Sequence, residues 1–306
     1  TPAFSPAGAM AGLKNLYDSV AVDAVLIPGS ALSAGVPDPT EEQLLAFFEP
    51  RAALEPGEAE DGIGYAQPAR IRLGWLVLDR GAISASVPAD RVEIIKQYEL
   101  DRQRPEADRR YPADIDTERP NIERDLRQSR TDQLMVEADR IIRSEVLRAT
   151  RTLHRENGLL HLPENWSENR PRLADVAETV VARLREQGVP IRTPEVTIRD
   201  DAWLRTADLD QLPIGRTFFR AGSRTIMTRD LPGLFDQRGF IEPLSMQVGV
   251  PQADPAAQDA AGNRYYLVVL DHRPAGPARS IEDAGRERVV SDYKSVEGFR
   301  RLTEQA

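Results

Sequence analysis

The chain of 306 residues contains no cysteine. Without a thiol it cannot form a disulfide, use a thiolate nucleophile, or hold zinc or an iron–sulfur cluster through cysteine. The absence fits an oxidising compartment, where a stray thiol is a liability, although some cytoplasmic proteins also lack cysteine. It therefore favours an extracytoplasmic location without requiring one.

Positive charge is also scarce, with 40 basic against 49 acidic residues and a net charge of −9. Such a balance repels phosphate groups and anionic lipids. Lysine occurs only at Lys14, Lys96 and Lys294, and we attribute the preference for arginine to genomic base composition. We expect no nucleic-acid partner.

Long apolar runs are missing as well. The longest, residues 25–27 and 265–270, fall far short of the roughly 20 residues that cross a bilayer. The sequence therefore contains no membrane span. Because it opens at Thr1, with no initiator methionine and no signal-like apolar stretch, we expect a leader or membrane anchor upstream of Thr1.

What the chain does contain is a faint internal repeat. Residues 22–36 (VDAVLIPGSALSAGV) align without a gap on residues 73–87 (LGWLVLDRGAISASV). In both copies a proline and an amphipathic helix follow. The repeat therefore predicts a unit made of a strand, an extended loop and a helix. Repeated modules that share a sheet usually form a scaffold or a binding surface, and the repeat predicts architecture rather than chemistry.

Periodicity and capping signals predict the remaining elements. Helices are expected over residues 40–50, 88–98, 120–157, 173–188 and 280–304. A buried strand is expected over residues 70–79, with two faces formed by Ile71, Leu73, Trp75 and Val77 and by Leu76 and Leu78. Trp75 and Tyr98 could line a peptide pocket, but aromatic residues on periodic faces are more often core.

Three segments carry a family resemblance: Phe47-Phe48-Glu49 and Gln97-Tyr98-Glu99, which end the acidic helices, and the stretch 67–73 (QPARIRL). In this order they resemble the SurA/PpiD group of parvulin-type periplasmic folding factors. The C-terminal half is similar to a degenerate parvulin domain, in which residues 240–245 and 262–270 correspond to the closing pair of strands. The resemblance implies a periplasmic relative of the peptidyl-prolyl isomerases that acts on polypeptides.

The departures from that group fall where catalysis would take place. Parvulins typically carry one histidine in the first strand of the isomerase domain and another in the last, but the matching positions here hold Leu73-Gly74 and Tyr266. The Gly-Gly-Asp-Leu-Gly stretch of active members has no counterpart between Ala221 and Gly239. Isomerisation must lower a barrier of about 20 kcal/mol, and loss of the imidazole pair removes the hydrogen-bonded network of the pocket. We therefore expect no catalytic residues.

Four side chains, Phe218, Phe219, Met246 and Tyr266, are the candidate peptide-binding residues. Together they could form an apolar cradle that holds an unfolded segment without isomerising it. The alternative is that all four are ordinary core residues. Neither interpretation requires a cofactor, and we expect none.

The three histidines do not predict a metal or catalytic site. His154 and His161 flank a loop near Glu156, at a spacing that does not place them on one helical face, so we expect surface residues and no metal. His272 lies beside Asp271 and could be a base with an orienting carboxylate, but no nucleophile motif accompanies it.

Taken together, the elements predict an α+β fold with repeated strand-loop-helix modules, a long central helix and a small parvulin-like half closed by a C-terminal helix. We expect four regions: a duplicated-module domain, a long helix or arm, a parvulin-like α+β domain, and a packing helix, over residues 1–118, 119–158, 159–275 and 276–306. The apolar side of the last helix should contact an N-terminal element or another subunit.

Three functional interpretations remain open. The first is a non-catalytic, chaperone-like or scaffold protein of the cell envelope that binds unfolded or partner polypeptide. The second is an active prolyl isomerase that uses a different residue set around Tyr266 and Met246. The third is a dedicated assembly module that docks through its long or terminal helix, with a homodimer through the terminal helices as one form of it.

Overall fold

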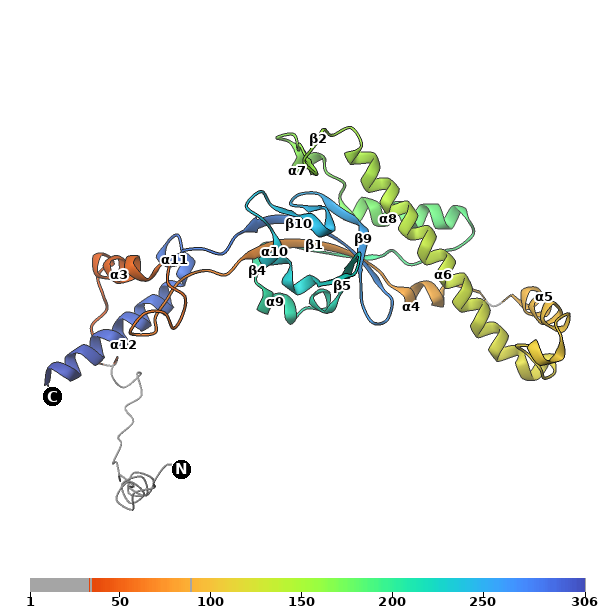
Figure 1. The fold of residues 1–306 in the computed structure, drawn as a ribbon, viewed down its shortest axis with the longest axis horizontal. Coiled ribbons are helices and arrows are strands. Elements are labelled where there is room, and N and C mark those ends of the chain that lie inside the picture. Colours follow the sequence, from red (N-terminus) through yellow and green to blue (C-terminus); the bar gives the residue numbers. More distant parts are fainter. Residues whose placement is uncertain (1–32, 34, 89, 306) are drawn as a thin grey trace, which may run out of the picture. The chain divides into compact units, whose positions relative to one another are not determined.

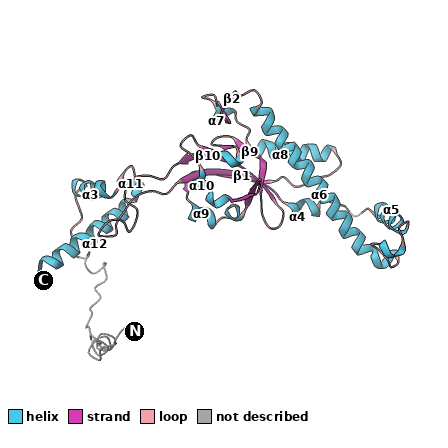
Figure 2. Cartoon of the chain, viewed as in Figure 1, coloured by secondary structure: helices cyan, strands magenta, loops and turns pink. Residues whose placement is uncertain are grey.

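The computed structural model describes residue 33, residues 35–88 and residues 90–305. The described residues divide into two compact units: a terminal unit, whose described residues fall within 33–66 and 277–305, and a sheet unit within residues 67–276 (Figure 1). Helices and antiparallel strands are both abundant, which confirms the predicted α+β class (Figure 2). Among the described helices, none has an apolar stretch long enough to cross a membrane.

The terminal unit begins, in its described part, with the helix α3 (Glu41–Phe48). Its start is the predicted capping box, in which Thr40 Oγ1 accepts a hydrogen bond from the Gln43 backbone and Gln43 Oε1 accepts one from the Thr40 backbone. The expected C-terminal helix is interrupted at Gly285, whose φ is 88°. The two pieces are α11 (Ile281–Ala284) and α12 (Arg286–Gln305).

The core of the terminal unit is formed by the helix α3 and the two C-terminal helices, α11 and α12. Phe47 of α3 meets Tyr293 of α12 edge-on, with ring centroids 5.5 Å apart, and Val289 is fully buried in the same cluster. The last helix is expected from the sequence to contact an N-terminal element or another subunit. In the structure it contacts the N-terminal element α3. Farther along α12, Phe299 and Leu302 remain 59% and 39% exposed.

The sheet unit is built on one antiparallel sheet with the strand order β4-β1-β10-β9-β5-β6. Its strands are β1 (Arg70–Leu78), β4 (Glu195–Leu204), β5 (Phe218–Ala221), β6 (Arg224–Met227), β9 (Pro251–Gln258) and β10 (Arg264–Arg273). β1 lies between β4 and β10, so a strand from the first quarter of the chain completes a sheet whose other strands come from its second half. The residues expected in a domain of 1–118 are consequently divided between the two units.

Each face of the sheet carries its own hydrophobic core. On one face Leu76 and Leu78 pack with α4 (Arg80–Ala85), α6 (Ile115–Thr150) and α8 (Leu173–Glu186). On the other face Leu73, Trp75 and their neighbours pack with the short helices α9 (Thr206–Asp210) and α10 (Leu231–Leu234). The two predicted faces of β1 are confirmed, and Trp75 is a core residue with 7% exposure.

The second copy of the repeat differs from its expected form. After β1 the chain forms the helix α4 rather than an extended loop, because Asp79 caps it by accepting a hydrogen bond from the Ala82 backbone at 2.9 Å. The following helix, α5 (Arg91–Arg102), starts at the cap Asp90 rather than at Pro88. Most of the first copy, residues 22–36, lies outside the described residues, so its relation to the second copy stays a prediction.

The long helix is present but displaced along the sequence. α6 starts after the cap Asp114 and ends at Thr150, which gives 36 residues, or about 54 Å at 1.5 Å per residue. Its first turns pack on α5 through Ile94 and Tyr98, whereas Val92 and Ile95 of α5 are 71% and 44% exposed.

The remaining elements are short. They are the 3₁₀ turns η1 (Glu49–Arg51), η2 (Glu106–Asp108), η3 (Pro213–Arg216), η4 (Thr228–Asp230) and η5 (Glu242–Leu244), the helix α7 (Trp166–Asn169), and the strands β2 (Arg155–Glu156), β3 (Leu159–Leu160), β7 (Phe240–Ile241) and β8 (Met246–Gln247). β7 pairs with β8 outside the main sheet. The closing pair of the main sheet is therefore β9 and β10, and not the segment 240–245 that the resemblance suggested.

Candidate functional site

The four residues of the predicted cradle do not lie together. Phe219 and Met246 are 0% and 1% exposed in the core on the α9 side of the sheet, whereas Tyr266, 1% exposed, lies in the core on the α6 side. Phe218 is half-buried and precedes Phe219 in β5, where consecutive side chains point to opposite faces. The burial of Phe219, Met246 and Tyr266 fits the alternative that they are core residues, and these three residues are divided between the two faces of the sheet.

The positions at which the resemblance places histidines lie on adjacent strands. Gly74 of β1 pairs with Val268 of β10, and Leu76 pairs with Tyr266. The hydroxyl of Tyr266 donates to Asp139 of α6 at 2.7 Å. The position on β10 thus holds a buried tyrosine whose hydroxyl is bonded to a carboxylate of α6, where the resemblance would place an imidazole.

His272 does not form a base with its neighbouring carboxylate. Asp271 accepts a hydrogen bond from the backbone of His272 at 2.8 Å, not from its ring. The ring stacks on Phe235 with centroids 4.9 Å apart, and Nε2 lies 3.3 Å from the carbonyl oxygen of Pro232. Burial lowers the pKa of His272, and its contacts are those of a packing residue.

The segment after α6 forms a β-hairpin that the sequence analysis did not anticipate. β2 and β3 pair with Arg155 opposite Leu160 and Glu156 opposite Leu159, and the turn is Asn157-Gly158 with φ values of 49° and 86°. Two consecutive positive φ values are those of a type I′ turn, for which Asn-Gly is the strongest sequence signal. The helix expected over residues 120–157 instead runs up to this dipeptide.

A single glutamine fixes the hairpin to the rest of the sheet unit. The side chain of Gln247, in β8, accepts a hydrogen bond from the Leu160 backbone and donates one to the Leu160 carbonyl, both at 2.8 Å. Six residues beyond β3, the indole of Trp166 donates to the carbonyl of Gly249 at 2.9 Å in a buried position. The hairpin therefore has a defined place against β7 and β8.

Hairpin pairing gathers three side chains with metal-ligating atoms. The His161 backbone donates to the His154 carbonyl at 2.8 Å, which makes these residues the next cross-strand pair after Arg155 and Leu160. Paired residues share a face, and so do residues two apart on one strand, so Glu156 joins them. Their ligand atoms all lie within 4.8 Å of one another. Helical spacing does not place these residues on one face, whereas hairpin pairing does.

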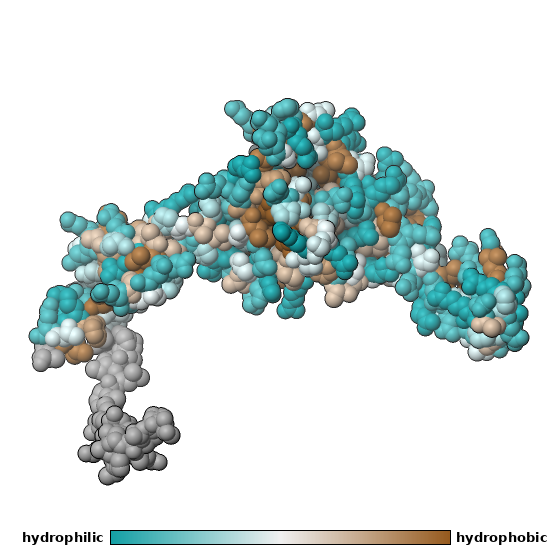
Figure 3. Space-filling model, viewed as in Figure 1, coloured by the Kyte–Doolittle hydropathy of each residue, from teal (hydrophilic) through white to brown (hydrophobic). Residues whose placement is uncertain are grey.

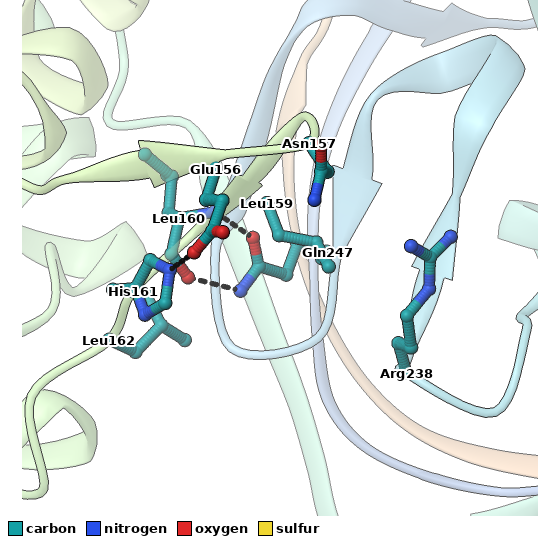
Figure 4. Close-up of a pocket in the computed structure, with 8 residues that line it drawn as sticks. All are labelled: Glu156, Asn157, Leu159, Leu160, His161, Leu162, Arg238 and Gln247. Atoms are coloured by element: carbon teal, nitrogen blue, oxygen red, sulfur yellow. Dashed lines mark hydrogen bonds and ion pairs between the residues drawn. The ribbon is translucent and has the colours of Figure 1, made fainter.

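Two hollows flank the hairpin. One, of about 540 Å³, is lined by Glu156, His161, Gln247 and, across the opening, Arg238 (Figure 4). Arg238 is itself paired with Asp236 at 2.6 Å. The lining of this pocket is mixed, because leucines of the hairpin segment lie beside these polar side chains: Leu159, Leu160 and Leu162.

The second hollow is a groove of about 310 Å³ between the last turns of α6, the hairpin and the start of β9. Its apolar lining includes Val146, Leu147, Leu160 and Val250, and Leu147 is 63% exposed. In the space-filling view apolar atoms reach the surface beside this end of α6 (Figure 3). We call this hollow the α6 groove.

Charged side chains border the α6 groove. Arg143 lies between two carboxylates, 2.9 Å from Asp139 and 3.2 Å from Asp254, and both Arg143 and Asp254 line the groove. The combination of an apolar lining, in which Leu147 is exposed, and a polar border can hold a chain segment with apolar side chains and a hydrogen-bonding backbone.

Comparisons with known proteins leave the chain without an assigned family. No family model matches it, and neither a curated protein nor a solved structure matches it.

Proposed function

We propose that this chain is a non-catalytic, chaperone-like or scaffold protein of the cell envelope that binds extended polypeptide and is related to the parvulin-type folding factors. The observation that carries the proposal is the α6 groove, with its exposed Leu147. Binding sites are usually concave and lined mainly by apolar side chains with a few polar groups, as this groove is. The occupant we assign to it is an unfolded segment with apolar side chains.

The positions of Tyr266 and Met246 support the proposal that the chain is not catalytic. Tyr266 is bonded to Asp139 in the interior, and Met246 is buried on the opposite side of the sheet. These two residues, which an atypical isomerase site would share, do not face a common pocket. A protease-coupled assay with a prolyl peptide should therefore give no acceleration, and robust turnover would overturn this half of the proposal.

Suppression of aggregation tests the binding half. The chain, in excess over two unrelated proteins that unfold on heating, should reduce light scattering by both. Leu147→Asp should weaken the suppression several-fold, because it places a charge at the apolar rim of the groove. Val136→Asp is the matched control, since Val136 is 59% exposed on the same helix and does not line the groove.

Two results would count against polypeptide binding at the α6 groove. Suppression by Leu147→Asp as strong as that by Val136→Asp would place binding elsewhere. Binding of one dedicated partner, without suppression of aggregation of unrelated proteins, would instead favour an assembly module. The exposed Phe299 of α12 would then be the first residue to substitute. Fractionation of cells that express the full gene tests the envelope location.

A further inference from the structure

We propose that the hairpin face formed by His154, Glu156 and His161 binds a divalent transition-metal ion of the zinc class. The ligand atoms of these three residues lie within 4.8 Å of one another, and all three residues are exposed. The proposal does not depend on polypeptide binding in the α6 groove. We call this set of residues the hairpin triad.

The donor set selects the class of ion. Two imidazoles and one carboxylate are typical ligands of zinc, copper and nickel, whereas magnesium and calcium prefer sites made of oxygen alone. The chain has three histidines in all, and two of them are adjacent across this hairpin, with ring centroids 5.3 Å apart.

The geometry is close to that of a coordinated ion. Zinc–nitrogen and zinc–oxygen bonds of about 2.1 Å in a tetrahedral site place neighbouring ligand atoms roughly 3.4 Å apart. His161 Nε2 and Glu156 Oε2 are already 3.1 Å apart, and in Figure 4 the two side chains point toward one another. Closing the remaining distances requires side-chain torsions of exposed residues and no movement of the backbone.

The backbone beneath the triad is held in place. The type I′ turn sets the register of the two strands, and the His161 amide is bonded to the His154 carbonyl at 2.8 Å. Gln247 binds both backbone groups of Leu160, the residue before His161. A ligand set on a fixed hairpin loses less conformational freedom on binding than one on a mobile loop.

Three protein ligands leave at least one coordination position for water or another ligand. Glu156 and His161 also line the 540 Å³ pocket, so an ion held by the triad lies at the wall of that pocket. Arg238, across the opening (Figure 4), would then give the pocket two centres that attract an anionic group.

An ordinary ion pair is the competing explanation. Glu156 and His161 are more than half exposed, and exposed pairs of this kind contribute little to stability. The two explanations differ in what they require of His154, which lies outside the Glu156–His161 pair and is needed only if an ion is bound.

The test is titration of the full chain, without a histidine tag, with zinc chloride in a calorimeter. We expect one ion per chain, a Kd of about 1 µM to 100 µM, and no binding of magnesium. His154→Ala and His161→Ala should each weaken binding at least about tenfold, and Glu156→Gln should weaken it as well. Cobalt(II) should give a visible absorption band that is lost in the double variant H154A/H161A.

His272→Gln is the matched control, because it removes the third imidazole and leaves the triad intact. It should bind zinc as the parent chain does. The triad residues are exposed, so their variants should keep the parent far-ultraviolet circular dichroism. Zinc affinity unchanged in H154A/H161A, or no zinc binding below about 1 mM, would overturn the proposal.

Discussion

The hydroxyl of Tyr266 donates a 2.7 Å hydrogen bond to Asp139 and so connects the central strand β10 to the long helix α6. The same carboxylate pairs with Arg143 at 2.9 Å and with Arg264 at 3.3 Å. Burial raises the pKa of Tyr266, and the negative charge of Asp139 raises it further. The phenol therefore stays protonated as a hydrogen-bond donor, which is a structural role.

Removal of this hydroxyl should be costly. Tyr266→Phe leaves the buried Asp139 with one donor fewer, and we expect the free energy of unfolding to fall by about 1–3 kcal/mol. Tyr265→Phe is the control, because Tyr265 bonds Asp259 at 3.1 Å in a partly buried contact and its loss should cost less. Urea denaturation of both variants measures the difference. Equal losses would contradict a special role for the Tyr266–Asp139 contact.

Stability should depend on His272 in mildly acidic solution. Burial is the main cause of its lowered pKa, and it outweighs the opposing contributions of the Pro232 carbonyl and of Asp271 and Asp236. Because the folded-state pKa lies below the unfolded value of about 6.5, the unfolded chain binds the proton more readily. The contribution is fully present above the unfolded pKa and is lost as the pH falls through the folded pKa.

We therefore expect a larger fall in unfolding free energy between pH 7.5 and pH 5 for the parent chain than for His272→Gln. Urea denaturation of both proteins at the two pH values measures this difference. Both proteins keep the exposed residues His154 and His161, so any contribution of these residues cancels in the comparison. Parallel pH profiles would show that His272 is not the responsible group.

The β2–β3 hairpin should open more often when the side chain of Gln247 is removed. Gln247→Ala deletes both 2.8 Å bonds to Leu160, and we expect the Leu160 amide to exchange with deuterium at least about tenfold faster. Gln187→Ala removes an exposed contact with Glu137, 3.1 Å long, and should leave that amide unchanged. Exchange followed by NMR or mass spectrometry distinguishes the two; an unchanged Leu160 would mean that other contacts hold the hairpin.

Local signals in the sequence predicted the parts of the fold that depend on local interactions. The capping box at Thr40, the two faces of β1 and the buried stripe of α8 are all present. The pairing of β1 with β10 joins residues such as Leu76 and Tyr266, which are far apart in the chain, and periodicity contains no information about such partners.

The lack of information about strand partners also explains why the four predicted cradle residues do not lie together. Whether Phe219 and Tyr266 share a face depends on the order and register of β5, β9 and β10, and not on hydrophobicity. The hairpin triad, in contrast, was within reach of the sequence. Asn157-Gly158 predicts a two-residue turn, and counting outward from it pairs His154 with His161.

Glycine positions provide a final test of the packing around α9. A Cβ on Gly215, in η3, would lie 2.0 Å from the carbonyl oxygen of Leu209, a backbone atom of a fully buried residue. Gly215→Ala should therefore lower the unfolding free energy by more than about 3 kcal/mol, since neither backbone can withdraw without disturbing the core. Gly233, in α10, has nothing within 4 Å of an added Cβ, so Gly233→Ala should be neutral or stabilise by up to about 1 kcal/mol. Urea denaturation compares the two, and a Gly215→Ala chain as stable as Gly233→Ala would refute the close approach of η3 to α9.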